Sequence, residues 1–339
     1  MKKKWQKRIL LVGMQWDYGQ QSRGSSGEKL WFYEPLCSLA EKVDCFWYDQ
    51  YLLQGNYSQL QIDLCNYAKS CQPDLIIFVP YKDQFSFETL DYLKTNYKTY
   101  AWFGDDQWRF DLYTKFYAPH FTYVSTTDLW SVYKYEKLGI QPIVSQWAAR
   151  TYGSEVGPLS RNETYDYEIS FVGGYSTYRE WFISQLKQQG FSVECFGAGW
   201  TTDRVTFQDM EFIFRKSKIN LNISNSANND IRFVLSDNSI FEEWKQAPKK
   251  AEQIKARNFE IPLAGGFQLS NYVLGLERFW EIGTEIAVYT TPEECIQQIR
   301  YFLDNETERH NITLKSHKRA LNEHTYSNRL DAILGAILS

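Results

Sequence analysis

The chain has 339 residues, which is long enough for two domains with a hydrophobic core each. Hydrophobic residues make up 43% of it and charged residues 23%, a composition that is typical of globular proteins and excludes a disordered one. The formal net charge of -4 supplies no excess of cations to displace the counterions of nucleic acid, so we expect no nucleic-acid partner.

The start of the chain could suggest a secretion signal. Residues 1–8 are basic and lead into the apolar stretch 9–13, but this stretch is too short for a signal peptide, and Asp17 follows it without a small-residue cleavage site. No segment reaches the roughly 20 apolar residues that a membrane-spanning helix needs. We therefore expect a cytoplasmic protein without a transmembrane segment, for which peripheral contact with a membrane stays open.

The spacing of cysteines and histidines does not indicate a metal site. No two of the six cysteines form a C-x-x-C pair, and the four histidines show no H-x-x-x-H spacing. We expect reduced cysteines, no bound metal and no cofactor.

Short apolar runs alternate with longer amphipathic runs from residue 9 onward, which is typical of βαβ units and a parallel sheet. These runs predict a first doubly wound domain over residues 1–150. Its expected strands are residues 9–12, 43–48, 75–79, 99–103, 121–125 and 142–146. Its expected helices are residues 28–41, 60–71, 85–95 and 128–138.

The polar loop 18–27 lies between the first strand and the first helix. In a doubly wound sheet such a loop lies at the carboxyl ends of the strands, where ligands bind. It is not a P-loop, because Glu28-Lys29 replaces the G-K-[ST] ending. Both a lip over a bound acceptor and an ordinary flexible loop fit its composition.

Residues 151–165 interrupt the periodicity with glycine, proline and polar residues and are expected to be a linker. A second α/β series follows over residues 166–322. Its expected strands are residues 169–172, 193–196, 218–224, 267–269 and 285–289. Its expected helices begin at Thr177 and near Asp209, or span residues 255–262, 292–303 and 306–322. A last helix is expected over residues 325–338. The strand 218–224 alternates polar and apolar residues, which predicts one covered face.

A glycine pair follows the first strand of this second series. Gly173-Gly174 leads to Thr177-Tyr178-Arg179-Glu180, whose spacing is that of a capping box opening a helix. A strand, a glycine turn and a helix N-terminus together predict a seat for an anion.

The stretch 255–266 combines two cations, a carboxylate and a glycine pair. On a helix, Arg257 and Glu260 stand at i and i+3 on one face, and Gly265-Gly266 ends the helix. A diphosphate needs fixed cations and N–H groups in place of its water, so we expect Lys255 and Arg257 to dominate its binding. The alternative interpretation is an amphipathic helix with a solvated Arg–Glu pair.

Over residues 165–330 the chain resembles the CgeB-type family of spore-maturation and surface-glycan glycosyltransferase-like proteins, which is similar to the wider GT-B group of nucleotide-sugar transferases. The resemblance rests on Phe171-Val172-Gly173-Gly174, Lys218-Ile219-Asn220-Leu221-Asn222, Lys255-Ala256-Arg257-Asn258-Phe259-Glu260 with Gly265-Gly266, the stretch 279–285, and His324-Thr325-Tyr326 with Arg329. It implies two Rossmann-like doubly wound domains facing a central cleft, with the donor held by the second. It also implies that the last helix, in residues 323–339, packs back on the first domain.

The function implied by the resemblance is metal-independent transfer of a sugar from a UDP- or GDP-linked donor to a surface polysaccharide, glycoprotein or related acceptor. Glu260 matches the glutamate that accepts hydrogen bonds from the ribose of the donor. Glu252 stands eight positions earlier, where retaining enzymes often carry another glutamate, but the glycine-aromatic residues usual between the two are absent, so retention does not follow. A non-catalytic nucleotide-sugar-binding or assembly module is the alternative.

A proton acceptor for an inverting transfer is expected in the first domain. Asp105 and Asp106 follow an expected strand, which places them at the mouth of that domain, and either can act as the base. The alternative is that one of them caps the next helix. His120 is the second choice for the base.

Overall fold

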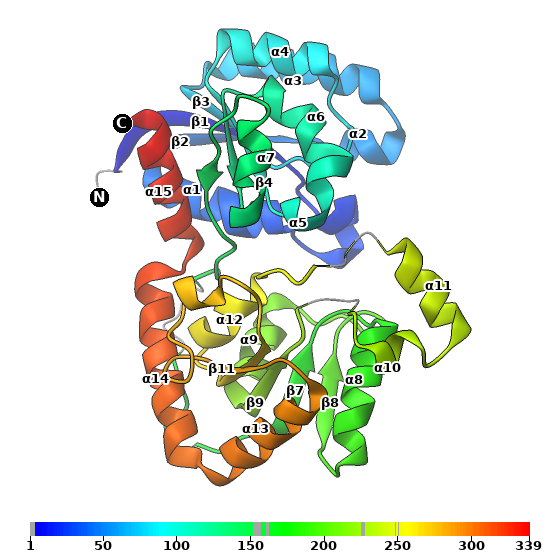
Figure 1. Cartoon of the computed structure of the whole chain (residues 1–339). Helices are drawn as coiled ribbons and strands as arrows, with labels where there is room; N and C mark the ends of the chain where they lie inside the picture. The colour runs from blue at the N-terminus through cyan, green and yellow to red at the C-terminus, as the bar shows by residue number, and fades with distance from the viewer. Residues whose placement is uncertain (1–3, 152–156, 161–162, 225–227, 248, 250) are drawn as a thin grey trace. The chain divides into compact units, whose positions relative to one another are not determined.

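The computed structural model describes residues 4–151, 157–160, 163–224, 228–247, 249 and 251–339 (Figure 1). The chain divides into two compact units. Unit 1 consists of Met1–Arg150 with Tyr326–Ser339, and unit 2 of Thr151–Thr325.

The sheet of unit 1 has six parallel strands in the order β2-β1-β3-β4-β5-β6. Leu10 of β1 lies between Asp44 of β2 and Ile76 of β3, which fixes the register at the centre of the sheet. Every residue of β3 and β4 is buried, which is typical of parallel strands covered on both faces. The strands are β1 (Trp5–Gly13), β2 (Ala40–Trp47), β3 (Leu75–Phe78), β4 (Thr99–Phe103), β5 (Tyr123–Thr126) and β6 (Ile143–Val144).

Helices cover both faces of this sheet. One core packs Leu60, Leu64 and Leu90 against the strands, and the other packs Leu36 and Leu334 against the opposite face. The α-helices are α1 (Glu34–Leu39), α2 (Asp49–Gln54), α3 (Tyr57–Cys71), α4 (Phe87–Asn96), α5 (Asp106–Arg109), α6 (Lys115–Tyr117), α7 (Val132–Glu136) and α15 (Tyr326–Leu338).

Two helices predicted for unit 1 differ from the structure. The predicted helix 28–41 is a π-helix, Glu28–Tyr33, followed by α1, and it ends at Leu39 because Ala40 already pairs with Trp5 as the start of β2. The predicted helix 128–138 is a 3-10 turn followed by the short helix α7.

The sheet of unit 2 has five parallel strands in the order β11-β10-β9-β7-β8. Helices α8 and α13 contribute to the core on one face, and α9 and α12 to the core on the other. The strands are β7 (Tyr167–Val172), β8 (Val193–Phe196), β9 (Ser217–Asn222), β10 (Gln268–Asn271) and β11 (Ala287–Tyr289). The helices are α8 (Thr177–Gln188), α9 (Phe207–Lys216), α10 (Ile231–Val234), α11 (Asn238–Gln246), α12 (Arg257–Leu263), α13 (Pro292–Asp304) and α14 (Glu306–Glu323).

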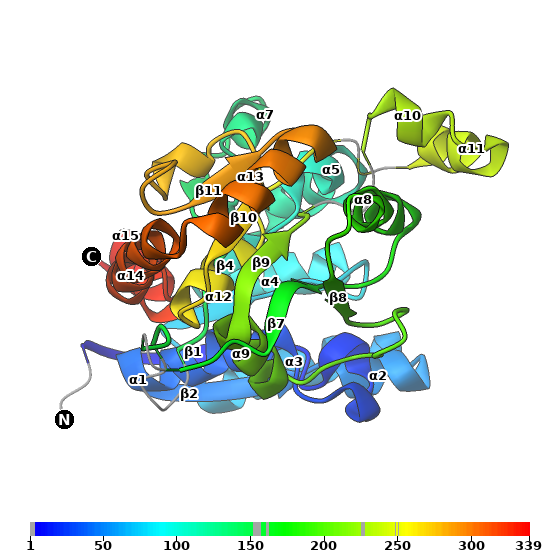
Figure 2. The same cartoon turned by 90° about the horizontal axis from the view of Figure 1, so that it is seen from below.

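Figures 1 and 2 show α11 projecting from the rest of unit 2, whereas α10 packs Phe233 against Tyr178 of α8. Because each sheet is parallel and has helices on both faces, both units have the doubly wound Rossmann-like architecture that the sequence predicts. No helix among the described residues is long and apolar enough to cross a membrane.

Strand β9 corrects the prediction of one covered face. Its polar residues Asn220 and Asn222 are buried, because β9 is a central strand of a sheet that helices cover on both faces. The Asn220 amide donates to the carbonyls of Phe214 (2.8 Å) and Phe267 (3.1 Å), and Asn222 donates to Ser270 Oγ (3.1 Å). The alternation in sequence thus reflects hydrogen-bonded polar side chains inside the sheet, not a solvated face.

Helix α12 ends as predicted at a glycine pair. The N–H groups of Gly265 and Gly266 donate to the carbonyls of Pro262 and Ile261, at 3.0 Å each, which is the Schellman arrangement. Gly265 has φ +78°, and a Cβ built there would lie 2.4 Å from the backbone nitrogen of Pro158. The turn therefore needs glycine for its conformation and for the backbone that packs on it.

Replacing Gly265 by alanine is expected to lower the free energy of unfolding of unit 2 by about 3 kcal/mol, from left-handed strain plus the clash with Pro158. Gly190→Ala is the matched control, because Gly190 has φ +88° but a Cβ added there would meet nothing within 4 Å, and strain alone costs about 1 kcal/mol. Denaturant titration of both variants measures the difference. Equal losses would show that the contact with Pro158 contributes nothing.

Candidate functional site

The glycine turn after β7 is held by the neighbouring turn after β8. The Gly173 N–H donates to the Phe196 carbonyl (2.8 Å), and the Gly173 carbonyl accepts a hydrogen bond from Trp200 Nε1 (2.9 Å). Gly197 has φ +131°, and a Cβ there would lie 2.5 Å from the Gly173 oxygen. Gly197 must therefore be glycine for the two turns to pack, and a Cβ added at Gly173 would lie 2.8 Å from the Phe171 ring. Gly174 is exposed at the carboxyl end of β7.

Helix α8 begins directly after this turn. Its N-cap is Ser176, whose side chain accepts the Arg179 N–H at 3.2 Å, so the predicted capping box at Thr177 is one residue late. The physical consequence is unchanged, because the cap still places the first turn of α8 beside the glycine pair.

Arg179 ties three backbone segments together at this edge of the sheet. Its guanidinium donates to the carbonyls of Gly174 (2.7 Å), Ile223 (3.0 Å) and Ser224 (3.4 Å). Burial, and next the positive charge of Arg257, lower the pKa of Arg179 to about 10. Arg179 was not predicted as part of the site, although a cation in the first turn after a glycine pair was a usable signal.

Glu252 faces the same edge from the segment before α12. Its carboxylate accepts hydrogen bonds from the amides of Asn228 (3.1 Å) and Asn271 (3.0 Å), and Asn271 in turn accepts the Ser224 N–H at 2.8 Å. Burial raises the pKa of Glu252 to about 7, even though both amides and the charge of Arg179 act in the opposite direction. Glu252 is thus held in place and partly protonated near neutral pH.

Arg257 and Glu260 form the pair that helical spacing predicts. Arg257 donates to Glu260 Oε2 at 2.6 Å, and its guanidinium lies 5.2 Å from the ring centroid of Phe214. Glu260 is only 6% exposed, so the alternative of a solvated ion pair is wrong. Burial raises the pKa of Glu260, opposed by the charge of Arg257.

Arg179, Glu252, Arg257 and Glu260 are named here the arginine–glutamate cluster. Arg179 is close enough to Glu252 and Arg257 for each charge to shift its pKa. Burial raises the pKa of both carboxylates, and the positive charges of the arginines act in the opposite direction. Lys255 adjoins it in the chain, and its backbone N–H donates to Asn258 Oδ1 at 3.1 Å.

The two aspartates expected at the mouth of unit 1 have different surroundings. Asp106 is 1% exposed, and its two oxygens accept hydrogen bonds from Thr114 Oγ1 and Tyr135 Oη, both at 2.7 Å. Burial raises the pKa of Asp106 to about 6. We infer that Asp106 fastens α5 to its neighbours. Asp105 is partly exposed at the N-cap position of α5, without a capping hydrogen bond from its side chain.

His120, the second choice for a base, is held against α4. Its Nδ1 lies 2.7 Å from Asp91 Oδ1, and its ring stacks on Phe87 at 4.3 Å between centroids. Within the described part of the chain, no group of three or more His, Cys, Asp or Glu side chains is arranged to hold a metal ion. None of the six cysteines, all of which lie among the described residues, is in a disulfide bond.

The class of the protein is defined by two doubly wound parallel sheets, the second of which carries the arginine–glutamate cluster and a glycine turn at the carboxyl ends of its strands. The chain has the GT-B fold of nucleotide-sugar transferases, as the comparison with solved structures shows.

Residues 179–335 match the model of a family described as glycosyl transferase-like. The matched segment contains all four members of the arginine–glutamate cluster. No curated protein sequence matches the chain.

Several solved structures resemble the chain over nearly its whole length. Anabaena Alr3699/HepE in complex with UDP-glucose gives a TM-score of 0.63 at 10% identity, covering 97% of this chain and 99% of that one. Sucrose-phosphate synthase from Thermosynechococcus elongatus gives 0.65 at 8% identity, covering 98% and 99%. The lipopolysaccharide outer core galactosyltransferase WaaB gives 0.53 at 11% identity, covering 97% and 99%. At these identities the likeness is one of fold.

The raised pKa of Asp106 makes the stability of unit 1 depend on pH. A carboxyl group whose pKa rises from 3.8 to about 6 on folding stabilises the fold fully below pH 4, and this contribution is lost as the pH rises through 6. Between pH 4 and pH 7 the free energy of unfolding of the wild type should fall by on the order of 2 kcal/mol relative to Asp106→Asn. Denaturant titrations at several pH values measure this difference, and parallel pH profiles would contradict the buried state of Asp106.

Proposed function

We propose that the protein is a glycosyltransferase that moves a sugar from a nucleotide-diphosphate donor, of the UDP-linked kind, to a hydroxyl group of an acceptor. One observation carries the proposal: two arginines lie within electrostatic reach of each other beside a glycine turn, at the carboxyl ends of parallel strands. Arg257 is paired with Glu260 and Arg179 bonds backbone carbonyls, so a ligand with adjacent negative charges would be attracted by both, and a diphosphate is such a ligand. The glycosyl transferase-like segment and the UDP-glucose complex of Alr3699/HepE support the same choice.

In this proposal the members of the cluster have separate tasks. Arg179, Arg257 and Lys255 bind the diphosphate, with the exposed Gly174 close to it. Glu260 accepts hydrogen bonds from the ribose hydroxyls, and Glu252 lies toward the donor sugar. Gly173, Gly265 and Gly266 shape the turns that hold these side chains.

The reaction follows from this arrangement of charge. The acceptor oxygen forms a bond to the anomeric carbon while the bond from that carbon to the diphosphate oxygen breaks, and the acceptor proton passes to a base. Negative charge grows on the leaving diphosphate, where the fixed guanidinium groups stabilise it without a metal ion. Asp105 is the proposed base, because its side chain reaches solvent whereas Asp106 is enclosed.

The kind of sugar transferred, the acceptor and the cellular location are proposed from the resemblance of residues 165–330 to the CgeB-type family. We propose a cytoplasmic hexosyltransferase that modifies a surface polysaccharide, a glycoprotein or a related acceptor. A GDP-linked donor is the alternative to UDP within the same site.

Calorimetric titration with UDP tests the proposed site. Arg257→Ala should weaken binding by about tenfold to a hundredfold, because it removes a charge-assisted hydrogen bond to the diphosphate. Arg300→Ala is the matched control, since Arg300 is an exposed arginine of unit 2 that bonds Gln189 at 2.9 Å away from the cluster. Equal affinity in both variants would remove Arg257 from the site, and no binding of UDP or GDP by the wild type would contradict the proposal.

A measurement of UDP release from a UDP-sugar distinguishes a glycosyltransferase from a non-catalytic binding module. UDP release from a UDP-sugar should require an acceptor and should continue at an unchanged rate after dialysis against EDTA, since arginines supply the positive charge. Loss of turnover in EDTA with recovery on adding Mg²⁺ or Mn²⁺ would contradict the metal-independent route. A wild type that binds UDP-sugars tightly but turns none over would favour the module.

A further inference from the structure

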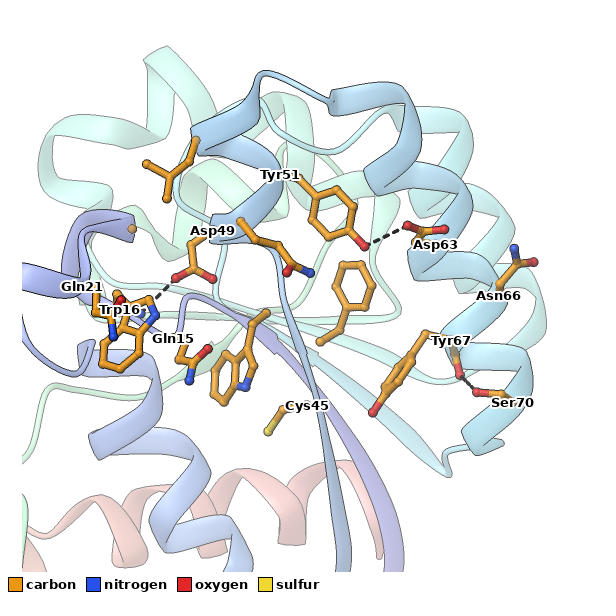
Figure 3. A pocket seen from close by; sticks show the side chains of 15 residues that line it. Gln15, Trp16, Gln21, Cys45, Asp49, Tyr51, Asp63, Asn66, Tyr67 and Ser70 are labelled. Carbon is orange, nitrogen blue, oxygen red and sulfur yellow. Dashed lines mark hydrogen bonds between the residues drawn. The ribbon is translucent and has the colours of Figure 1, made fainter.

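A cavity of about 780 Å³ lies in unit 1 along the edge strand β2 (Figure 3). Its walls come from the loop after β1, from the end of β2, and from helices α2 and α3. The volume lies within the range of about 300 to 1,000 Å³ of small-molecule sites. We name it the β2 cavity. None of the four members of the arginine–glutamate cluster lines it, so it is a separate site.

Aromatic rings form much of its surface. Tyr51 stacks on Phe46 with 5.6 Å between ring centroids and an interplanar angle of 15°, and Tyr67 leans against the same ring at 5.8 Å. Figure 3 shows Tyr67 directed from α3 toward Cys45. Trp16 and Trp47 also line the cavity and are partly exposed. These rings offer flat apolar faces next to solvent.

Polar groups surround the rings. The side-chain amides of Gln15, Gln21 and Asn66 have no hydrogen-bond partner within the described residues, so they are available to a ligand. Asp63 is oriented by the Tyr51 hydroxyl, which donates to its carboxylate at 2.9 Å. The backbone N–H of Trp16 donates to Asp49 at 3.0 Å, which fixes the loop over β2.

The charge of the lining narrows the class of ligand. Two carboxylates line the cavity, and no lysine, arginine or histidine is found among its described lining residues. Lys29 places its ammonium group 5.8 Å from the Trp16 ring centroid but does not line the cavity. A phosphate-bearing or carboxylate-bearing ligand would lose its hydration here without a cation to replace it.

We propose that the β2 cavity binds an uncharged saccharide. Sugar rings present apolar C–H faces, which pack on aromatic rings, and hydroxyl edges, which exchange hydrogen bonds with amides and carboxylates. The cavity supplies both kinds of surface and lacks, among its described lining residues, the cations that an anionic ligand requires. The binding site is argued from unit 1 alone and does not depend on nucleotide binding. Only the further step, that this saccharide is the acceptor, rests on the proposed function.

The matched pair of tyrosines on α3 makes the test specific. Tyr67 is 37% exposed and lines the cavity, whereas Tyr57 is 39% exposed on the same helix and does not. The full chain is titrated calorimetrically with maltotriose, cellotriose and chitotriose. We expect at least one to bind, with affinity about tenfold weaker in Tyr67→Ala and unchanged in Tyr57→Ala. Hydrogen–deuterium exchange should slow in residues 45–51 and 63–70 on binding.

Three results would overturn the inference. These are no binding of any of the three sugars at millimolar concentration, equal affinities in the two tyrosine variants with equal thermal stability, or displacement of the bound sugar by inorganic phosphate. Asn66→Ala provides a second variant if Tyr67→Ala unfolds, because Asn66 is exposed on α3 and its removal should weaken sugar binding without loss of stability. Titration with UDP is run in parallel, so failure of the saccharide site is distinguished from failure of the nucleotide site.

Discussion

The hydrogen bonds of Arg179 to three backbone carbonyls are the constraint on which the edge of unit 2 depends. They join the glycine turn after β7 to the segment just after β9, whose carbonyls lie 44 and 45 residues from the arginine in sequence. Carbonyl dipoles hold the guanidinium in place without neutralising it, so its full charge stays beside Arg257. Under the proposed function, the residue that orders the turn also binds the diphosphate of the donor.

Asp106 of unit 1 and Glu252 of unit 2 are both at least partly buried, but their surroundings differ. Asp106 has both oxygens occupied by hydroxyl groups and is enclosed, which suits a structural carboxyl group that is partly protonated near its pKa of about 6. Glu252 is also partly buried but ends among amides beside Arg179, at the open edge of the sheet. A raised pKa alone therefore does not identify a catalytic group, and the neighbouring groups and the exposure of the carboxyl group must be considered as well.

The sequence predicts well what local periodicity determines. The apolar strands β3 and β4 and the pair Arg257–Glu260 follow from spacing alone, and all are confirmed. The end of α1 before Ala40 and the buried Asn220 depend on contacts that lie far away in sequence, so local patterns misjudge them. Arg179 is not among the predicted site residues: its place in the first turn after a glycine pair is a local signal, but its carbonyl partners after β9 become neighbours only when the sheet forms.

The most direct test of the proposed donor site is a crystal structure of the protein with bound UDP. We expect the diphosphate within hydrogen-bonding distance of Arg179 and Arg257, with the ribose hydroxyls on Glu260. UDP bound in the β2 cavity, or elsewhere on the chain with both arginines free of it, would contradict the claim that the arginine–glutamate cluster is the donor site.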